Sequence, residues 1–269
     1  MEPVLITRGN SPLVLGFPHT GTHVPDDIHA KLNDEGQLLR DTDWHIEKLY
    51  DGLIEGATMV QATFHRYVID ANRDPSGQSL YPGQTTTGLV PETTFDNVPI
   101  WREGEEPDAD EITRRTALFH APYHAALAAE LARVKALHGY AVLYDCHSIR
   151  SVIPWLFEGT LPDFNIGTDM GRSCDPLIEA AAHAGTQATG RTEVLNGRFR
   201  GGWTTRHYGQ PDKGIHAIQM ELAQASHLDT EASPFALSDA KCAILRPQLT
   251  DILTRILCAA KAAGRAPQH

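Results

Sequence analysis

The chain has 269 residues, of which 41% are hydrophobic and 21% are charged, and its formal net charge is -11. This composition is ordinary for a globular protein with a hydrophobic core, and the length fits one α/β domain over residues 1–269. An acidic chain without a run of lysine or arginine lacks the basic face that nucleic acids and anionic membranes require. No stretch approaches the roughly eighteen consecutive apolar residues of a membrane span.

The N-terminus and the cysteines bear on the cellular compartment. Met1-Glu2-Pro3 lacks the basic and then apolar layout of a secretory signal peptide. The four cysteines lie far apart without CxxC spacing, which predicts neither a zinc knuckle nor a disulfide framework. We therefore expect a cytoplasmic protein. The sequence carries no signal for its oligomeric state.

The first half of the chain alternates predicted elements with polar turns. Residues 13–18 are typical of a buried strand that stops at a Pro-His-Thr-Gly turn, and residues 43–53 have apolar side chains at helical spacing. Residues 58–69 alternate and are rich in β-branched side chains, which predicts a strand. Residues 75–107 are rich in Gly, Pro, Thr and acidic residues, and their length predicts a functional loop rather than a simple connector.

Two long helices are predicted in the second half. One runs from about residue 108 to 138, and Pro122 is expected to kink or split it. The other covers residues 238–263 and closes the chain, with Pro247 expected to break it.

Two further strands are predicted at residues 140–145 and 215–222. Strands that alternate with helices predict an α/β fold, with a mostly parallel or mixed central sheet covered by helices on both faces. In such sheets, ligand-binding groups belong at the carboxyl ends of the strands. His19, Asn72 and His147 fall at these positions.

Two histidines and an acidic pair are candidate metal ligands. His19 and His147 each follow a predicted strand, in Phe-Pro-His-Thr-Gly and Asp-Cys-His-Ser, and Asp41 and Asp43 precede a predicted helix. Two imidazoles and one carboxylate form a three-ligand site with one position left for water, as in catalytic zinc sites. Asp145 or Ser148 is a candidate to orient His147.

Other roles are open for these residues. Either aspartate could cap a helix, and each histidine could be a hydrogen-bonded polar residue, because the self-sufficient HExxH spacing is absent. Cys146 beside His147 also suggests a thiol nucleophile with a histidine base. Adjacent residues of a strand point to opposite faces, however, so we expect Cys146 to be buried behind the site.

Six segments carry a resemblance to a known family. In chain order they are residues 18–22, 41–45, 66–75, 79–84, 145–148 and 196–203. Together they resemble the N-formylglutamate amidohydrolase (N-formylglutamate deformylase) family from about residue 11 to 258, with Thr20 where serine is expected. The resemblance implies metal-dependent hydrolysis of N-formyl-L-glutamate to L-glutamate and formate, the last step of a histidine degradation route.

The sequence is also distantly similar to zinc carboxypeptidases and aspartoacylase-type deacylases, which implies a zinc-carboxypeptidase-like fold. Those enzymes carry a glutamate three residues after the first metal-binding histidine, where this chain has Thr22. The carboxylate must then come from elsewhere, and Asp43 is the preferred source. The resemblance thus implies one Zn²⁺ or other divalent transition metal per chain, bound by His19, Asp43 and His147. It also implies that Glu221 is the general base and then the general acid.

A substrate with two carboxylates calls for two cationic anchors in an acidic chain. Arg73, with Asn72 beside it, fits the α-carboxylate through a bidentate contact. Arg198, Arg200 or Arg206, in a glycine-rich stretch that lets the backbone approach a ligand, are candidates for the side-chain carboxylate. Each of these three is equally compatible with an ordinary surface arginine.

Two rival functions compete with this interpretation. One is deacylation of another acidic N-acyl amino acid, such as an N-acetylated or N-carbamoyl acid. The other is a non-catalytic protein of the same fold that binds acidic metabolites. The two histidines, a carboxylate source and Glu221 together disfavour the second, although Glu221 could instead be a strand carboxylate paired with an arginine.

Overall fold

A seven-stranded mixed sheet forms the middle layer of the computed structural model, which describes residues 1–78 and 86–264. The strand order is β1-β3-β2-β4-β7-β5-β6. The strands are β1 (Val4–Thr7), β2 (Leu13–Phe17), β3 (Thr58–Ala62), β4 (Ala141–Ile149), β5 (Phe164–Gly167), β6 (Glu193–Leu195) and β7 (Ile215–Ala223). Strands β3, β2, β4 and β7 run parallel at the centre, while β1 and β5 pair antiparallel with β3 and β7.

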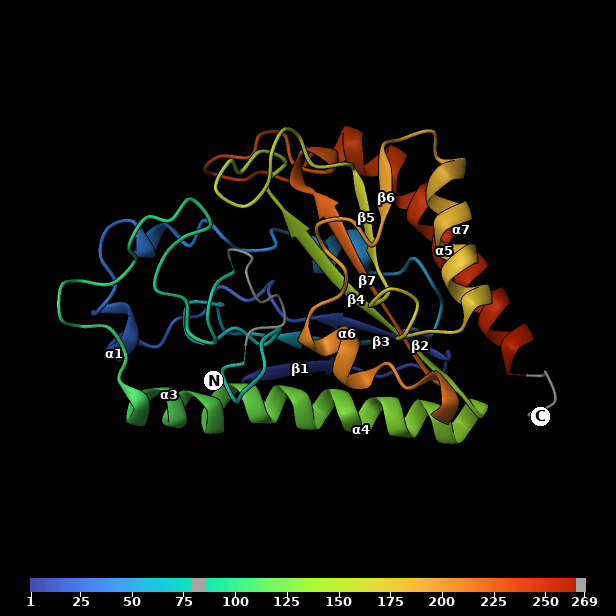
Figure 1. Cartoon of the computed structure of the whole chain (residues 1–269), viewed down its shortest axis with the longest axis horizontal. Coiled ribbons are helices and arrows are strands. Elements are labelled where there is room, and N and C mark those ends of the chain that lie inside the picture. The colour runs from blue at the N-terminus through green and yellow to red at the C-terminus, as the bar shows by residue number, and fades with distance from the viewer. Residues whose placement is uncertain (79–85, 265–269) are drawn as a thin grey trace.

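Helices cover both faces of this sheet, as Figure 1 shows. On one side lie α2 (Ile46–Tyr50), α5 (Pro176–Ala188) and α7 (Asp239–Ala263), and on the other lies α4 (Ala121–His138). The remaining helices are α1 (Asp26–His29), α3 (Ala109–Arg115) and α6 (Trp203–Tyr208), with a π-helical turn at Thr116–His120 and 3₁₀ turns at Gly36–Leu38, Pro211–Lys213 and Gln224–Ser226. The predicted α/β class, with a mixed sheet between two helical layers, is confirmed.

Strand β2 shows how the sequence produces the two cores. Leu13, Leu15 and Phe17 pack into the cluster beneath α5 and α7. Val14 points the other way and packs into the cluster beneath α4. Because every residue of β2 is buried, the strand lies in the middle of the molecule, and the turn after Phe17 emerges at the carboxyl edge of the parallel strands.

The two long helices differ in their response to proline. The expected helix over residues 108–138 is interrupted next to Pro122 by the π-helical turn, because proline cannot donate to the carbonyl four residues earlier. The expected break at Pro247 is wrong, since α7 continues through it. One missing hydrogen bond is tolerated there because Leu245 and Leu249 on either side are fully buried.

The observed ends of two strands also differ from the predicted ones. The strand expected over residues 58–69 ends at Ala62, and the apolar residues that follow are buried in turns instead. Strand β4 is longer than expected, so His147 lies inside it rather than after it. The described part of the expected loop over residues 75–107 contains no helix or strand beyond isolated bridges, and the matched segment 79–84 lies outside the described residues. Within the described ranges, no helix combines the length and apolar character needed to cross a bilayer.

Candidate active site

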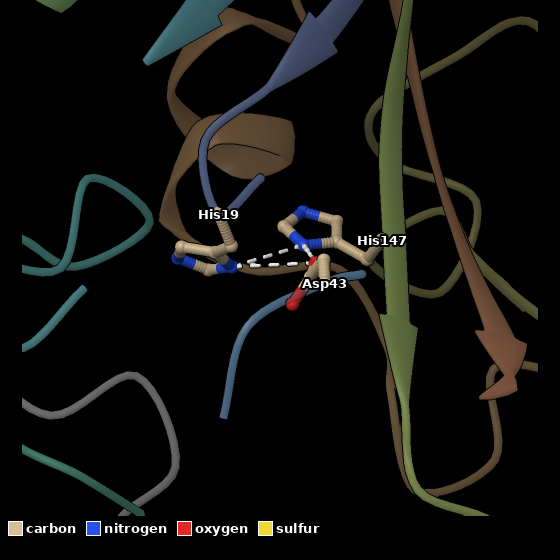
Figure 2. A group of neighbouring side chains, drawn as sticks. All are labelled: His19, Asp43 and His147. Carbon is tan, nitrogen blue, oxygen red and sulfur yellow. Dashed lines mark hydrogen bonds and ion pairs between the residues drawn. The ribbon is translucent and has the colours of Figure 1, made fainter. Parts of the chain in front are cut away.

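Three separate segments bring His19, Asp43 and His147 together. His19 follows β2 in a turn, His147 projects from β4, and Asp43 stands in the turn before α2. A backbone hydrogen bond of 3.0 Å from the Asp43 amide to the His19 carbonyl joins the two turns. Figure 2 shows the three side chains pointing toward one another.

The ligand atoms of these side chains form a tight triangle. The Nδ1 atoms of His19 and His147 are 3.2 Å apart, and Asp43 Oδ2 lies 3.1 Å from the Nδ1 of His147 and 3.7 Å from that of His19. All three residues are at most 2% exposed. In the described part of the chain, this is the group of histidine, cysteine and acidic side chains placed to share a metal ion.

The far nitrogen of each imidazole contacts a buried carboxylate. His19 Nε2 lies 2.7 Å from Asp70 Oδ1, and His147 Nε2 lies 3.0 Å from Asp145 Oδ2. A carboxylate only accepts, so each imidazole donates from Nε2 and turns its Nδ1 toward Asp43, where the Nδ1 lone pair is free to bind a metal once any proton on it is displaced. Three buried ligand atoms with lone pairs that face one another are stabilised by a shared cation. The two imidazole nitrogens and the carboxylate oxygen therefore fit a divalent metal ion.

The electrostatics of the cluster favour a cation. Burial alone would raise the pKa of Asp43, but the guanidinium of Arg66, 2.7 Å away, outweighs it and holds the pKa well below its usual range. Burial would likewise lower the pKa of His147, yet Asp145 and Asp43 together raise it well above its usual value. A metal ion that binds here must displace the proton of His147, so metal affinity falls as the pH is lowered.

Asp41, the other candidate carboxylate, points away from the histidines. Its Oδ2 accepts hydrogen bonds from the Tyr67 hydroxyl at 2.8 Å and from the Phe95 amide at 2.9 Å. Burial raises the pKa of Asp41 to about 6. Asp41 thus anchors the loop around Phe95, and Asp43 is the carboxylate of the cluster.

The cluster opens on a cavity of about 270 Å³. Its described lining includes the two histidines together with the polar side chains of Arg66, Asn72, Arg73, Arg198, Gln219 and Glu221. The rest of the lining is partly apolar, with Leu89, Phe95, Ile149, Leu156 and Phe199. This mixture of apolar walls and a few convergent polar groups is typical of a small-molecule site.

Glu221 lies beside His147 because β7 and β4 pair in parallel with these two residues in register. Its Oε2 accepts a hydrogen bond of 3.3 Å from Gln219 Nε2. Burial raises the pKa of Glu221 to about 8. The neighbouring His147 and Arg66 act against this burial and favour the ionised form of Glu221.

Two of the four predicted arginines reach the cavity. Arg73 donates from Nε to the Thr87 carbonyl at 2.9 Å and from Nη2 to the Thr87 hydroxyl at 2.8 Å, which holds its guanidinium at the cavity wall. Arg198 donates from Nε to the Leu156 carbonyl at 3.1 Å and also lines the cavity.

Arg200 and Arg206 are not brought to the cavity. Arg200 is exposed and its Nε donates to the Gly197 carbonyl at 3.2 Å. Arg206 lies on α6, where its Nε donates to the Gly201 carbonyl at 2.9 Å and faces Asp169 Oδ1 at 3.4 Å. Both are held by the backbone of the glycine-rich segment outside the described lining.

Sequence reasoning missed the roles of Arg66, Asp70 and Gln219. Arg66 is buried, pairs with Asp43 and lies over the Phe95 ring. Its Nε has no hydrogen-bond partner among the described residues. Signals were available for all three, because Arg66 and Asp70 lie in the matched segment 66–75 and Gln219 is a polar residue inside an apolar strand.

Cys146 is buried on the opposite face of β4 from His147, within the hydrophobic cluster beneath α5 and α7. Its Sγ contacts the Tyr144 carbonyl at 3.4 Å. Burial raises its pKa well above the usual value, which suppresses the thiolate that a nucleophile requires. The expected burial behind the site is confirmed.

Comparison with known proteins agrees with these features. Residues 11–228 match the family model of N-formylglutamate amidohydrolase. The chain is 48% identical over 260 residues to N-formylglutamate deformylase from Pseudomonas aeruginosa, covering 94% of this chain and 97% of the relative. It is 47% identical over 238 residues to N-formylglutamate deformylase from Pseudomonas putida, covering 87% and 88%.

Solved structures show the same fold. A crystal structure of N-formylglutamate amidohydrolase from Ralstonia eutropha JMP134 has a TM-score of 0.78 at 22% identity, covering 98% of this chain and 99% of that one. An Agrobacterium tumefaciens gene product has a TM-score of 0.72 at 19% identity, with 96% of each chain covered. The family resemblance in the sequence is therefore confirmed.

Proposed function

This chain belongs to the N-formylglutamate amidohydrolase family, and we propose that it hydrolyses N-formyl-L-glutamate to L-glutamate and formate with a bound divalent metal ion. The observation that carries the proposal is the His19–Asp43–His147 cluster opening on a cavity that also holds Glu221 and Arg73. The 48% identity to a deformylase over 94% of the chain supports the choice of substrate. The proposal places the enzyme in the cytoplasm, as one domain, at the end of histidine degradation.

The proposed metal ligands are His19, Asp43 and His147, with Zn²⁺ as the preferred ion. Two imidazoles and a carboxylate are the donor set of several catalytic zinc sites, and Asp70 and Asp145 supply the supporting carboxylates that orient metal-binding histidines. When bound, such an ion supplies Lewis-acid polarisation of the formyl group and of the attacking water.

Glu221 is the proposed proton carrier. In the reaction the water oxygen bonds to the formyl carbon, the carbon–nitrogen bond breaks, and the amino group of glutamate leaves. A carboxylate oxygen of Glu221 accepts the proton from the water and then returns it to the departing nitrogen. Burial raises the pKa of Glu221 even though the neighbouring His147 lowers it, and the raised pKa makes Glu221 a stronger base than an exposed glutamate.

The proposed substrate anchors are two arginines from segments that lie far apart in the sequence. Arg73, beside Asn72, takes the α-carboxylate, and Arg198 takes the side-chain carboxylate. Arg66 also faces the cavity, and its Nε, which has no hydrogen-bond partner within residues 1–78 and 86–264, can donate to a substrate oxygen. These cations supply the local positive charge that an acidic protein needs to bind a dianion.

A panel of N-acyl amino acids tests the substrate. N-Formyl-L-glutamate should be hydrolysed with a kcat/KM roughly 10²-fold or more above those of N-formyl-glutamine and N-formyl-alanine, because both lack the side-chain carboxylate that the proposed second arginine anchor binds. N-Acetyl-L-glutamate distinguishes a formyl-specific enzyme from a general deacylase. Equal rates on the three formyl compounds would contradict the two-anchor model, whereas a preference for the acetyl compound would support the rival deacylase.

A further inference from the structure

The turn that carries Asp70, Asn72 and Arg73 connects three parts of the proposed site. Asp70 Oδ1 contacts His19 Nε2 at 2.7 Å, Asn72 Nδ2 lies 3.2 Å from His147 Nε2, and Arg73 lines the cavity. The turn belongs to no helix or strand, so no regular hydrogen-bond ladder fixes its carbonyl groups. Its shape therefore depends on other donors.

Side chains hold three consecutive carbonyl groups of this turn. His124 donates from Nε2 to the Ala71 carbonyl at 2.7 Å, and His120 donates from Nε2 to the Arg73 carbonyl at 3.0 Å. Between them, the Asn72 carbonyl accepts from Nη1 of Arg73 at 3.1 Å. The two histidines are four residues apart, with His120 at the end of the π-helical turn and His124 in the first turn of α4, so they present their rings from one face.

The two imidazoles are themselves fixed by α6. The Trp203 ring centroid lies 4.6 Å from that of His124 and 5.6 Å from that of His120. The Tyr208 hydroxyl lies 3.0 Å from Nδ1 of His124 and 3.1 Å from the backbone carbonyl of His124, and both atoms are acceptors for its single proton. The pair is thus packed between α4 and α6 rather than exposed.

Burial keeps both imidazoles neutral. It lowers the pKa of His124 to about 3, and it lowers that of His120 below its usual value. A neutral imidazole has one N–H group, and the carbonyl acceptors place it at Nε2 in both residues. Each histidine is therefore a single directed donor.

We propose that His120 and His124 are positioning residues, which fix the carbonyl groups of Arg73 and Ala71 and thereby hold Asn72 and Arg73 at the cavity. This inference rests on the proposed function, because it assigns the held residues to that same site. His120 acts on Arg73 and hence on substrate binding. His124 acts on the segment on either side of Ala71 and hence on the residues that contact the two clustered histidines.

Two substitutions of His120 distinguish the effect of its N–H donor from the effect of its packed ring. In His120→Phe the ring stays between α4 and α6 but the donor is lost, so the KM for N-formyl-L-glutamate should rise about 5-fold to 10-fold with kcat changed by less than about twofold. His120→Gln keeps an N–H donor and should restore most of the loss. In an Arg73→Met background, His120→Phe should add no further rise in KM.

His124→Phe should lower kcat/KM by about 5-fold, and His124→Gln should restore it.

His138→Phe is the matched control. His138 lies at the other end of α4 and also donates from Nε2 to a carbonyl, that of Asn10 at 2.7 Å, so its replacement should leave KM unchanged. An unchanged KM in folded His120→Phe, or an equal rise in the Arg73→Met background, would overturn the inference. His120→Asn, which also loses the reach to the carbonyl, replaces His120→Phe if that variant does not fold.

The two proposals fail in different ways. Wild-type protein that releases no formate from N-formyl-L-glutamate refutes the proposed function and leaves KM undefined. Crystal structures of the wild type and of His120→Phe then decide the inference directly. A displaced Arg73 in the variant supports positioning by His120, and an unmoved Arg73 contradicts it.

Discussion

His147→Ala and His19→Ala should each lose the bound metal ion and reduce the turnover of N-formyl-L-glutamate by roughly 10³-fold or more. The size follows from the several kcal/mol of transition-state stabilisation that a catalytic metal supplies, with each 1.4 kcal/mol worth about tenfold. Removing either imidazole also leaves a buried carboxylate, Asp145 or Asp70, without its histidine contact. Metal content by elemental analysis and formate release should be measured on the same preparation.

His183→Ala is the matched control for these variants. His183 also faces a carboxylate, with its Nε2 3.0 Å from Glu193 Oε2, but it lies on α5 away from the cavity. This variant should keep metal and activity. Full metal content with retained turnover in either His19→Ala or His147→Ala would show that the metal site is elsewhere.

Glu221→Gln should lower kcat by roughly 10² to 10⁴, the usual contribution of general acid–base catalysis, while metal content and KM stay nearly unchanged. The amide keeps the shape and hydrogen-bonding capacity of the side chain but cannot carry the proton. Burial raises the pKa of Glu221 to about 8, so in the wild type activity should rise with pH as the carboxyl ionises. A bound cation favours the ionised form and moves this rise below pH 8, and in the variant the rise should flatten.

Glu130→Gln provides the structural comparison. Glu130 is a buried carboxylate paired with Arg8 and Arg133, outside the cavity. Its neutralisation should lower the melting temperature while leaving kcat intact, because Arg8 and Arg133 lose the charge-assisted hydrogen bonds that Glu130 accepts from them. If Glu221→Gln behaves in the same way, with wild-type turnover from a folded and metal-loaded variant, Glu221 is not the base.

The positions of His19 and His147 were predictable because they depend on local signals. A buried apolar run predicts a strand, and in parallel sheets the carboxyl ends of neighbouring strands meet. The choice between Asp41 and Asp43 depended on which way a turn faces. In the structure the turn places Asp43 next to His19 through a backbone hydrogen bond, while Asp41 is turned toward Tyr67 and Phe95.

Contacts between segments that are distant in the sequence could not be predicted from local patterns. Arg66 reaches Asp43 across 23 positions of sequence, and no spacing rule links the two. Arg198 and Arg200 are two residues apart, yet only Arg198 lines the described cavity, because an irregular glycine-rich segment has no periodicity from which to infer a face. Short edge strands such as β1 and β6 lack the alternation of apolar and polar residues from which a strand is predicted.

The most direct test of metal-dependent deformylation is formate release by one preparation before and after metal removal. The purified protein should be assayed with N-formyl-L-glutamate as isolated, after chelation, and after readdition of one equivalent of Zn²⁺. We expect the chelated protein to remain folded and to lose nearly all formate release, and the reloaded protein to recover it. Undiminished formate release from folded, metal-free protein would contradict the role assigned to His19, Asp43 and His147.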